Sequence, residues 1–106
     1  MNSNEGRWRT NGGSGSALDA LRAALRHEDA RVRSQAARAI GYMGPDAAEA
    51  APDLVRMLAK GSDAREALNA LREIGEAAVP HIQRLIGGDQ DLNSAALEAL
   101  RAIGCH

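Results

Sequence analysis

Apolar residues recur from residue 17 onward at the spacing of helices that bury one face. Leu18, Leu21 and Leu25 are three or four residues apart, which places them on one side of a helix. The same spacing continues through the chain and predicts six helices in three pairs: 17–27 with 30–42, 46–60 with 63–74, and 77–86 with 92–103. We therefore expect an all-α protein.

An Ile-Gly dipeptide ends every second predicted helix. The three copies are Ile40-Gly41, Ile74-Gly75 and Ile103-Gly104, and their isoleucines are 34 and 29 residues apart. The preceding residues also align, as RSQAARAIG, ALNALREIG and AALEALRAIG. A recurrence of this length is typical of an α-solenoid built from helix pairs. The sequence thus predicts a repeat domain over residues 17–106, with repeats at about 17–44, 45–75 and 76–104.

Two prolines occupy matching places in the second and third repeats. Pro52 and Pro80 each follow a stretch of Gly, acidic and Ala residues and precede an apolar run. A proline inside a helix removes a hydrogen bond and bends the helix, so the recurrence favours a bend that belongs to the repeat. The alternative is that each proline lies in the first turn of a shorter helix that follows a separate turn.

Composition agrees with a helical fold and narrows the classes of partner. Of the 106 residues, 44% are apolar, mostly Ala and Leu, with no Phe, one Trp and one Tyr. Ala and Leu are strong helix formers, whereas the usual strand-forming residues are sparse. The net charge is −1, from 13 basic and 14 acidic residues, so the chain has no overall positive potential that would attract nucleic acid or an anionic membrane. We expect neither as a partner.

Residues 1–16 differ from the rest of the chain. They are rich in Gly, Ser and Asn and have no periodic apolar face, which predicts a disordered N-terminal arm or linker. They also lack the apolar segment of a secretory signal, and no apolar run is long enough to span a bilayer. The single cysteine, Cys105, excludes an intramolecular disulfide framework. These features favour a cytoplasmic protein.

Residues 17–106 resemble the HEAT-like repeats of the phycocyanobilin-lyase (E-Z) type. Units of that type run from Gly, an Ala-rich turn and Pro through a Leu-rich helix to an acidic turn, then Val-Arg, Ala-Ala and Leu/Ile-Gly. The first repeat fits best, through Asp29, Val32, Arg33, Ala36, Ala37, Ile40 and Gly41. The resemblance implies a short right-handed α-solenoid of about three helix pairs. It implies function only loosely, because such repeats serve many partners.

The charged positions of this repeat type are only partly present. The acidic turn residue recurs as Asp63, but Ala67 and Ala96 occupy the positions that match Arg33. The Asp–Arg ladder typical of such stacks is therefore incomplete. We expect packing between the repeats to rely on small apolar residues.

The second helix of each repeat carries polar residues opposite its apolar face. We call these residues, at i, i+4 and i+7 of each helix, the second-helix stripe: Arg31, Gln35, Arg38, Arg65, Asn69, Arg72, Ser94, Glu98 and Arg101. In HEAT-like folds the second helices line the concave surface, so stacking would align the stripe there. Arginine's planar donors suit an acidic or amide-rich peptide, and the mixed sign argues against nucleic acid. The alternative is a solvated face on which Glu66, Glu73 and Glu98 neutralise the arginines.

The sequence offers no recognisable catalytic, metal or cofactor site. His27, His81 and His106 share no spacing that would bring two of them onto one helix face for a metal, and no nucleophile–base pattern is present. We therefore predict a non-enzymatic protein- or peptide-binding scaffold without a cofactor. Two alternatives stay open: an accessory subunit of chromophore or cofactor attachment, which the resemblance allows, and a structural fragment of a longer array. The last repeat has no polar capping helix, which would allow self-association at that end.

Overall fold

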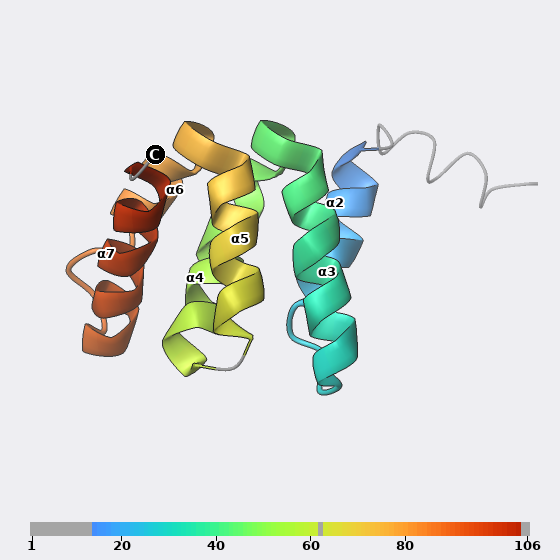
Figure 1. Cartoon of the computed structure of the whole chain (residues 1–106), viewed down its shortest axis with the longest axis horizontal. Helices are drawn as coiled ribbons and strands as arrows, with labels where there is room; N and C mark the ends of the chain where they lie inside the picture. The colour runs from blue at the N-terminus through green and yellow to red at the C-terminus, as the bar shows by residue number, and fades with distance from the viewer. Residues whose placement is uncertain (1–13, 62, 105–106) are drawn as a thin grey trace, which may run out of the picture.

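The computed structural model describes residues 14–61 and 63–104, and within these ranges it contains helices and no strand. The helices form two layers (Figure 1). The first layer holds α3 (Ala30–Met43), α5 (Ala64–Ile74) and α7 (Gln90–Gly104), and the second holds α2 (Ser14–Ala24), α4 (Ala51–Lys60) and α6 (Val79–Gln83). Helix α5 is central, because it packs against α3, α4 and α7. The predicted all-α solenoid of helix pairs is confirmed.

The first helix is shifted toward the N-terminus relative to its prediction. It begins at Ser14 and ends at Ala24, instead of spanning 17–27. After Ala24 the backbone tightens, since the amides of Arg26 and His27 donate to carbonyls three residues earlier. Of the predicted arm 1–16, residues 1–13 lie outside the described part of the chain, and the backbone of 14–16 forms the start of α2.

The two recurring prolines begin helices and do not bend them. A 3-10 helix, η1 (Gly44–Ala50), precedes α4, and a second, η2 (Gly75–Ala78), precedes α6. Pro52 and Pro80 lie in the first turns of α4 and α6. An amide N–H at that place has no partner within the helix, so proline removes no helical hydrogen bond there. The predicted bend is therefore wrong, and the alternative of a shorter helix after a separate turn is confirmed.

The first helix of the third repeat is much shorter than predicted. The pattern indicated a helix over 77–86, whereas α6 spans only Val79–Gln83. Beyond it, the amides of Leu85 and Ile86 donate to carbonyls three residues back, so the chain leaves the α-helical path. The amide of Gly87 then donates to the side chain of Asn93 on α7, at 3.0 Å. This contact holds the turn that leads from α6 to α7.

The glycines of the Ile-Gly dipeptides have different roles. Gly41 lies inside α3, which continues to Met43 and ends at Gly44 with a φ of 67°. A Cβ at position 41 would be 3.3 Å from the Cα of Ala70 on α5, so glycine allows the two helices to approach closely. Gly75, in contrast, does end α5, with a φ of 74°. The helix predicted over 30–42 ends at Met43, so Ile40-Gly41 lies in its last turn, where Gly41 serves packing.

The core lies between the two layers and combines a few large side chains with many alanines. The largest fully buried side chains are Ile40, Leu54, Val55, Leu71, Ile74 and Ile82. Ala67 and Ala96, which stand where the repeat pattern has an arginine, are completely buried. Together with the Gly41–Ala70 approach, they show that small residues contribute to the packing between the repeats.

Candidate binding surfaces

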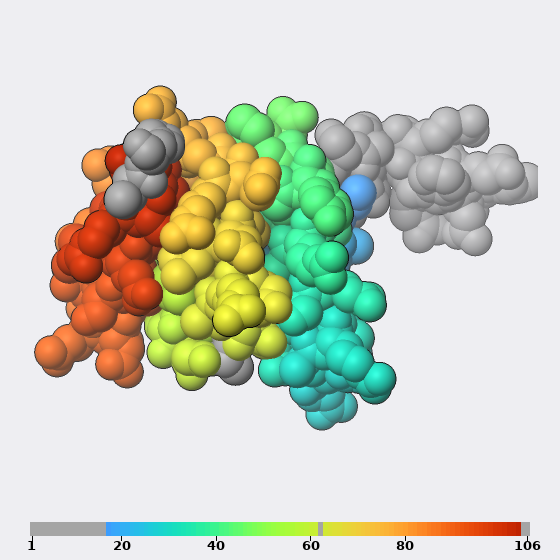
Figure 2. All heavy atoms as spheres, viewed as in Figure 1, coloured from blue at the N-terminus to red at the C-terminus, as the bar shows by residue number. Residues whose placement is uncertain are grey.

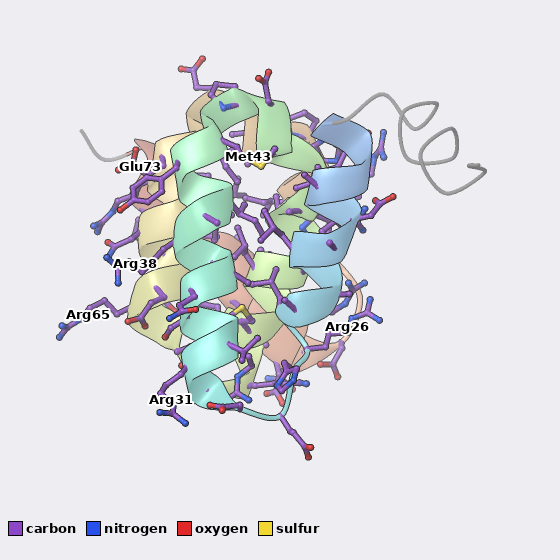
Figure 3. All side chains as sticks on the ribbon, turned by 90° about the vertical axis from the view of Figure 1, so that its right-hand side faces the viewer. Arg26, Arg31, Arg38, Met43, Arg65 and Glu73 are labelled. Atoms are coloured by element: carbon purple, nitrogen blue, oxygen red, sulfur yellow. The ribbon has the colours of Figure 1, made fainter. Side chains whose placement is uncertain are left out.

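The second-helix stripe lies on the layer formed by α3, α5 and α7. All nine of its side chains are exposed. Figure 2 shows this face, with α3, α5 and α7 side by side. Seen from the end of the solenoid, Arg31, Arg38 and Arg65 project to one side, while Arg26 of the other layer projects to the opposite side (Figure 3). The structure thus places the stripe on one face of the molecule.

A groove between α3 and α5 gathers part of the stripe. It is a hollow of about 450 Å³, with Gly41 and Ala70 in its lining, so the close approach of these two residues forms part of its wall. Its polar lining residues come from both helices: Arg38, Tyr42, Glu66, Asn69, Arg72 and Glu73. Three stripe residues therefore share one groove with two carboxylates and an aromatic ring.

The other stripe residues share the face but do not line this groove. Gln35 borders a smaller hollow of about 210 Å³ beside Arg38 and Tyr42. Arg31 lies 3.5 Å from Asp29 in an exposed ion pair, where screening by water makes the interaction weak. The remaining stripe residues lie along α5 and α7, outside both hollows: Arg65, Ser94, Glu98 and Arg101.

The arginines of the stripe are largely free of partners. Within residues 14–61 and 63–104, four of them form no ion pair: Arg38, Arg65, Arg72 and Arg101. The local neutralisation by Glu66, Glu73 and Glu98 that a merely solvated face would show is therefore not formed as direct contacts. Their donors face solvent and are available to a ligand.

Two exposed apolar side chains on this face were missed by the sequence reasoning. Tyr42 is 80% exposed and follows Arg38 by one helical turn, and Leu97 is 45% exposed between Ser94 and Arg101. The exposed ring of Tyr42 favours binding, because tyrosine and arginine are enriched among the residues that supply most of the energy of interfaces. Both could have been predicted to lie on this face, because Tyr42 follows Arg38 and Leu97 follows Ser94 at the spacing of one helical turn.

A buried carboxylate forms a second feature that the sequence reasoning missed. Asp53, in the first turn of α4, is only 4% exposed. Its Oδ2 accepts a hydrogen bond from Nε of Arg22 at 2.6 Å, and this contact raises the pKa of the Arg22 guanidinium. Its Oδ1 lies 3.6 Å from Nη2 of Arg26 and 3.5 Å from Nη1 of Arg56. One carboxylate therefore links α2 of the first repeat to α4 of the second.

One rung of the Asp–Arg ladder is formed between the first two repeats. Nε of Arg33 donates to Oδ2 of Asp63 at 2.8 Å, and its Nη1 donates to the carbonyls of His27 and Glu28 at 2.7 and 3.0 Å. Asp63 makes no side-chain cap to α5, because its backbone is left-handed, with a φ of 58°, and not in the extended conformation of a capping residue. Ala67 is buried on the next helix, so the rung is not repeated there.

The histidines of the described chain do not form a metal site. His27 accepts the amide of Asp29 at its Nδ1 at 3.0 Å, and His81 is half-buried on α6, whereas Cys105 and His106 lie outside the described residues. No group of three His, Cys, Asp or Glu side chains within those residues could hold a metal ion. No helix in the same ranges has both the length and the apolar character needed to cross a bilayer.

Comparison with known proteins agrees with this architecture. The sequence profile described as HEAT repeats matches residues 7–68, which is more than half of the chain. The match covers the first repeat and most of the second, including the Arg33–Asp63 pair. No curated protein and no solved structure matches the chain.

Proposed function

The chain belongs to the HEAT-repeat family, and from this premise we propose that it is a non-catalytic scaffold that binds a protein segment on its second-helix stripe. Solenoids of stacked helix pairs use their extended surfaces in this way. The observation that carries the proposal is the groove between α3 and α5, which Arg38, Arg72 and the exposed ring of Tyr42 line together.

The chemistry of the groove favours an extended, acidic or amide-rich segment. Each arginine presents a planar fork of donors that fits a carboxylate or an amide oxygen. Asn69 adds an amide that can donate and accept, while Glu66 and Glu73 can accept backbone N–H groups. Tyr42 offers an apolar surface for a side chain of the segment. A nucleic acid fits less well, because the carboxylates of Glu66 and Glu73 would repel its phosphates.

Random peptides displayed on phage provide a probe that does not depend on the identity of the natural partner. Peptides selected on the wild-type chain are synthesised with a fluorophore, and their affinities are measured by fluorescence anisotropy. We expect enrichment of Asp, Glu, Asn and Gln. We expect Arg72→Ala to weaken binding about tenfold or more, because hydrogen bonds to charged groups are worth about 1.5–3 kcal/mol each.

The matched control is Arg84→Ala. Arg84 is an exposed arginine in the turn after α6, away from the groove, so its removal should leave the affinity unchanged. Neither variant should lower the melting temperature much, since an exposed charge contributes little to stability. Equal affinities of wild type and Arg72→Ala, with both folded, would contradict the proposal. Equal losses in both variants would indicate general charge attraction and would contradict it as well.

The two alternative functions, chromophore attachment and a role within a longer array, predict different experimental results. The sequence resemblance to the phycocyanobilin-lyase type would place the chain in chromophore attachment, and an absorbance titration with a bilin tests this directly. A role within a longer array, or self-association, would use the outer side of α6 and α7. There Val79, Pro80 and Leu100 border a hollow of about 680 Å³. If the chain self-associates through this hollow, light scattering should show a dimer.

A further inference from the structure

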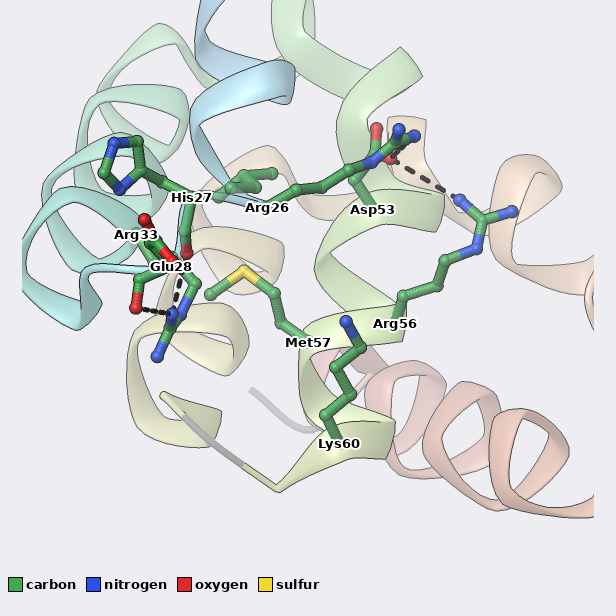
Figure 4. Close-up of a pocket in the computed structure, with 9 residues that line it drawn as sticks. Arg26, His27, Glu28, Arg33, Asp53, Arg56, Met57 and Lys60 are labelled. Atoms are coloured by element: carbon green, nitrogen blue, oxygen red, sulfur yellow. Dashed lines mark hydrogen bonds and ion pairs between the residues drawn. The ribbon is translucent and has the colours of Figure 1, made fainter.

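A second hollow lies away from the stripe, between the end of α2 and the length of α4 (Figure 4). Its volume is about 250 Å³. Its walls carry four cationic side chains, Arg26, Arg33, Arg56 and Lys60, with the carboxylates of Asp53 and Glu28. Such a hollow is large enough for a small anion, and its charge decides which anion fits.

The carboxylate of Asp53 makes a close hydrogen bond to only one of the three arginines around it. Arg22 holds its Oδ2 at 2.6 Å and offsets its charge, while Arg26 and Arg56 share the Oδ1 at 3.6 and 3.5 Å, beyond good hydrogen-bond distance. The side chains of Arg26 and Arg56 are 73% and 51% exposed, so these two contacts are weak and screened. Asp53 thus positions two guanidinium groups at the edge of the hollow and leaves most of their donors unused.

Lys60 adds a third cation beside Arg26 and Arg56. It follows Arg56 by one turn of α4, and helical side chains lean toward the N-terminus, so its amine is directed toward Arg56 and Asp53. Figure 4 shows the Lys60 side chain extending along α4 in this direction, with His27, Glu28 and Arg33 facing it across the hollow. Within the described ranges no carboxylate lies at ion-pair distance from Lys60.

The groups at this site carry a surplus of two positive charges. Arg33 is engaged by Asp63 and by two carbonyls, so it shapes the wall and is not free. Among the side chains that line the hollow, four cations face two carboxylates, and one of these two, Glu28, is exposed and forms no ion pair in the part of the chain that the structure describes. A monovalent anion would leave part of this charge unmatched.

We propose that the hollow between α2 and α4 binds a phosphate group through Arg26, Arg56 and Lys60. A phosphomonoester carries about −1.5 to −2 charges at neutral pH, which matches the two cations in excess of the carboxylates, and its three acceptor oxygens match the three side chains. Arginine forks and the lysine amine are the side chains that commonly bind phosphate. The phosphate can be inorganic or part of a phosphorylated peptide side chain, and both present the same dianionic group.

The experiment titrates the full-length chain with three probes at constant ionic strength. These are inorganic phosphate, a short phosphoserine peptide and the same peptide without phosphate, with binding followed by calorimetry and by amide chemical shifts. We expect shifts at Arg26, Arg56 and Lys60 with phosphate. Tighter binding of the phosphopeptide than of inorganic phosphate would assign the site to a modified protein segment, and equal binding would assign it to the free anion.

Variants separate a specific site from general attraction. We expect Lys60→Gln and Arg56→Gln each to weaken phosphate binding about tenfold, the loss of one charge-assisted contact. Arg84→Gln, at an exposed arginine that lines neither this hollow nor the groove between α3 and α5, is the matched control and should bind like the wild type. Equal weakening in the control, or equal binding of the peptide with and without its phosphate, would overturn the proposal. Circular dichroism of each variant confirms that the fold is intact.

Discussion

Replacing Ile74 by alanine tests the central packing of the solenoid. Ile74 is 1% exposed on α5, the helix that packs against both neighbours in its layer and against α4. The change removes three buried carbon groups, whose transfer to water costs about 0.8 kcal/mol each, or about 2.5 kcal/mol together. The cavity left behind adds to this, so the loss should fall in the upper part of the range of about 2–5 kcal/mol for such truncations.

Urea unfolding followed by far-UV circular dichroism measures this loss. For a domain of this size it corresponds to a fall of about 10 °C or more in melting temperature. Ile103→Ala is the matched comparison, because Ile103 holds the equivalent place on α7 and is also buried, but α7 has a packed neighbour on one side only. We expect Ile103→Ala to cost less. A loss below about 1 kcal/mol for Ile74→Ala, under the range for core truncation, would refute the reasoning.

Two further predictions concern how the helices begin and pack. Gly41→Val should destabilise the chain by about 1–3 kcal/mol, because a Cβ at this position already lies 3.3 Å from the backbone of Ala70; an unchanged melting temperature would show that α3 and α5 can separate freely. Asp29→Ala should cost about 1 kcal/mol, since the Asp29 carboxylate accepts the amide of Arg31 at 2.9 Å and caps α3; urea unfolding checks this, and no loss would mean that water replaces the cap.

The repeat architecture could be predicted because its signals are local and recur. The apolar spacing placed Ile40, Ile74 and Ile103 on buried faces, and all three are buried. The same pattern could not reveal that Gly41 serves helix contact, because Gly75 has the same neighbour and does end a helix. Propensity alone also could not decide between a proline within a helix and a proline at its start, since both fit the same sequence.

The two candidate sites differ in how far the sequence could reveal them. The stripe was predictable because its residues repeat at helical spacing on α3, α5 and α7, and all of them are exposed. The charge cluster at Asp53 joins residues that are 31 positions apart, Arg22 and Asp53, on helices of different repeats. Their meeting depends on how α2 and α4 pack, which no local pattern encodes. An acidic residue directly after a proline is typical of the first turn of a helix, where a negative charge is favourable, and Asp53 does lie in the first turn of α4.

The most direct test of the binding proposal is an amide chemical-shift map of the nitrogen-labelled chain with a library-selected acidic peptide. We predict that the shifted amides cluster on α3, α5 and α7, centred on Arg38, Tyr42 and Arg72 at the groove. Saturable shifts confined to α2, α4 and α6, or spread evenly over both layers, would contradict it.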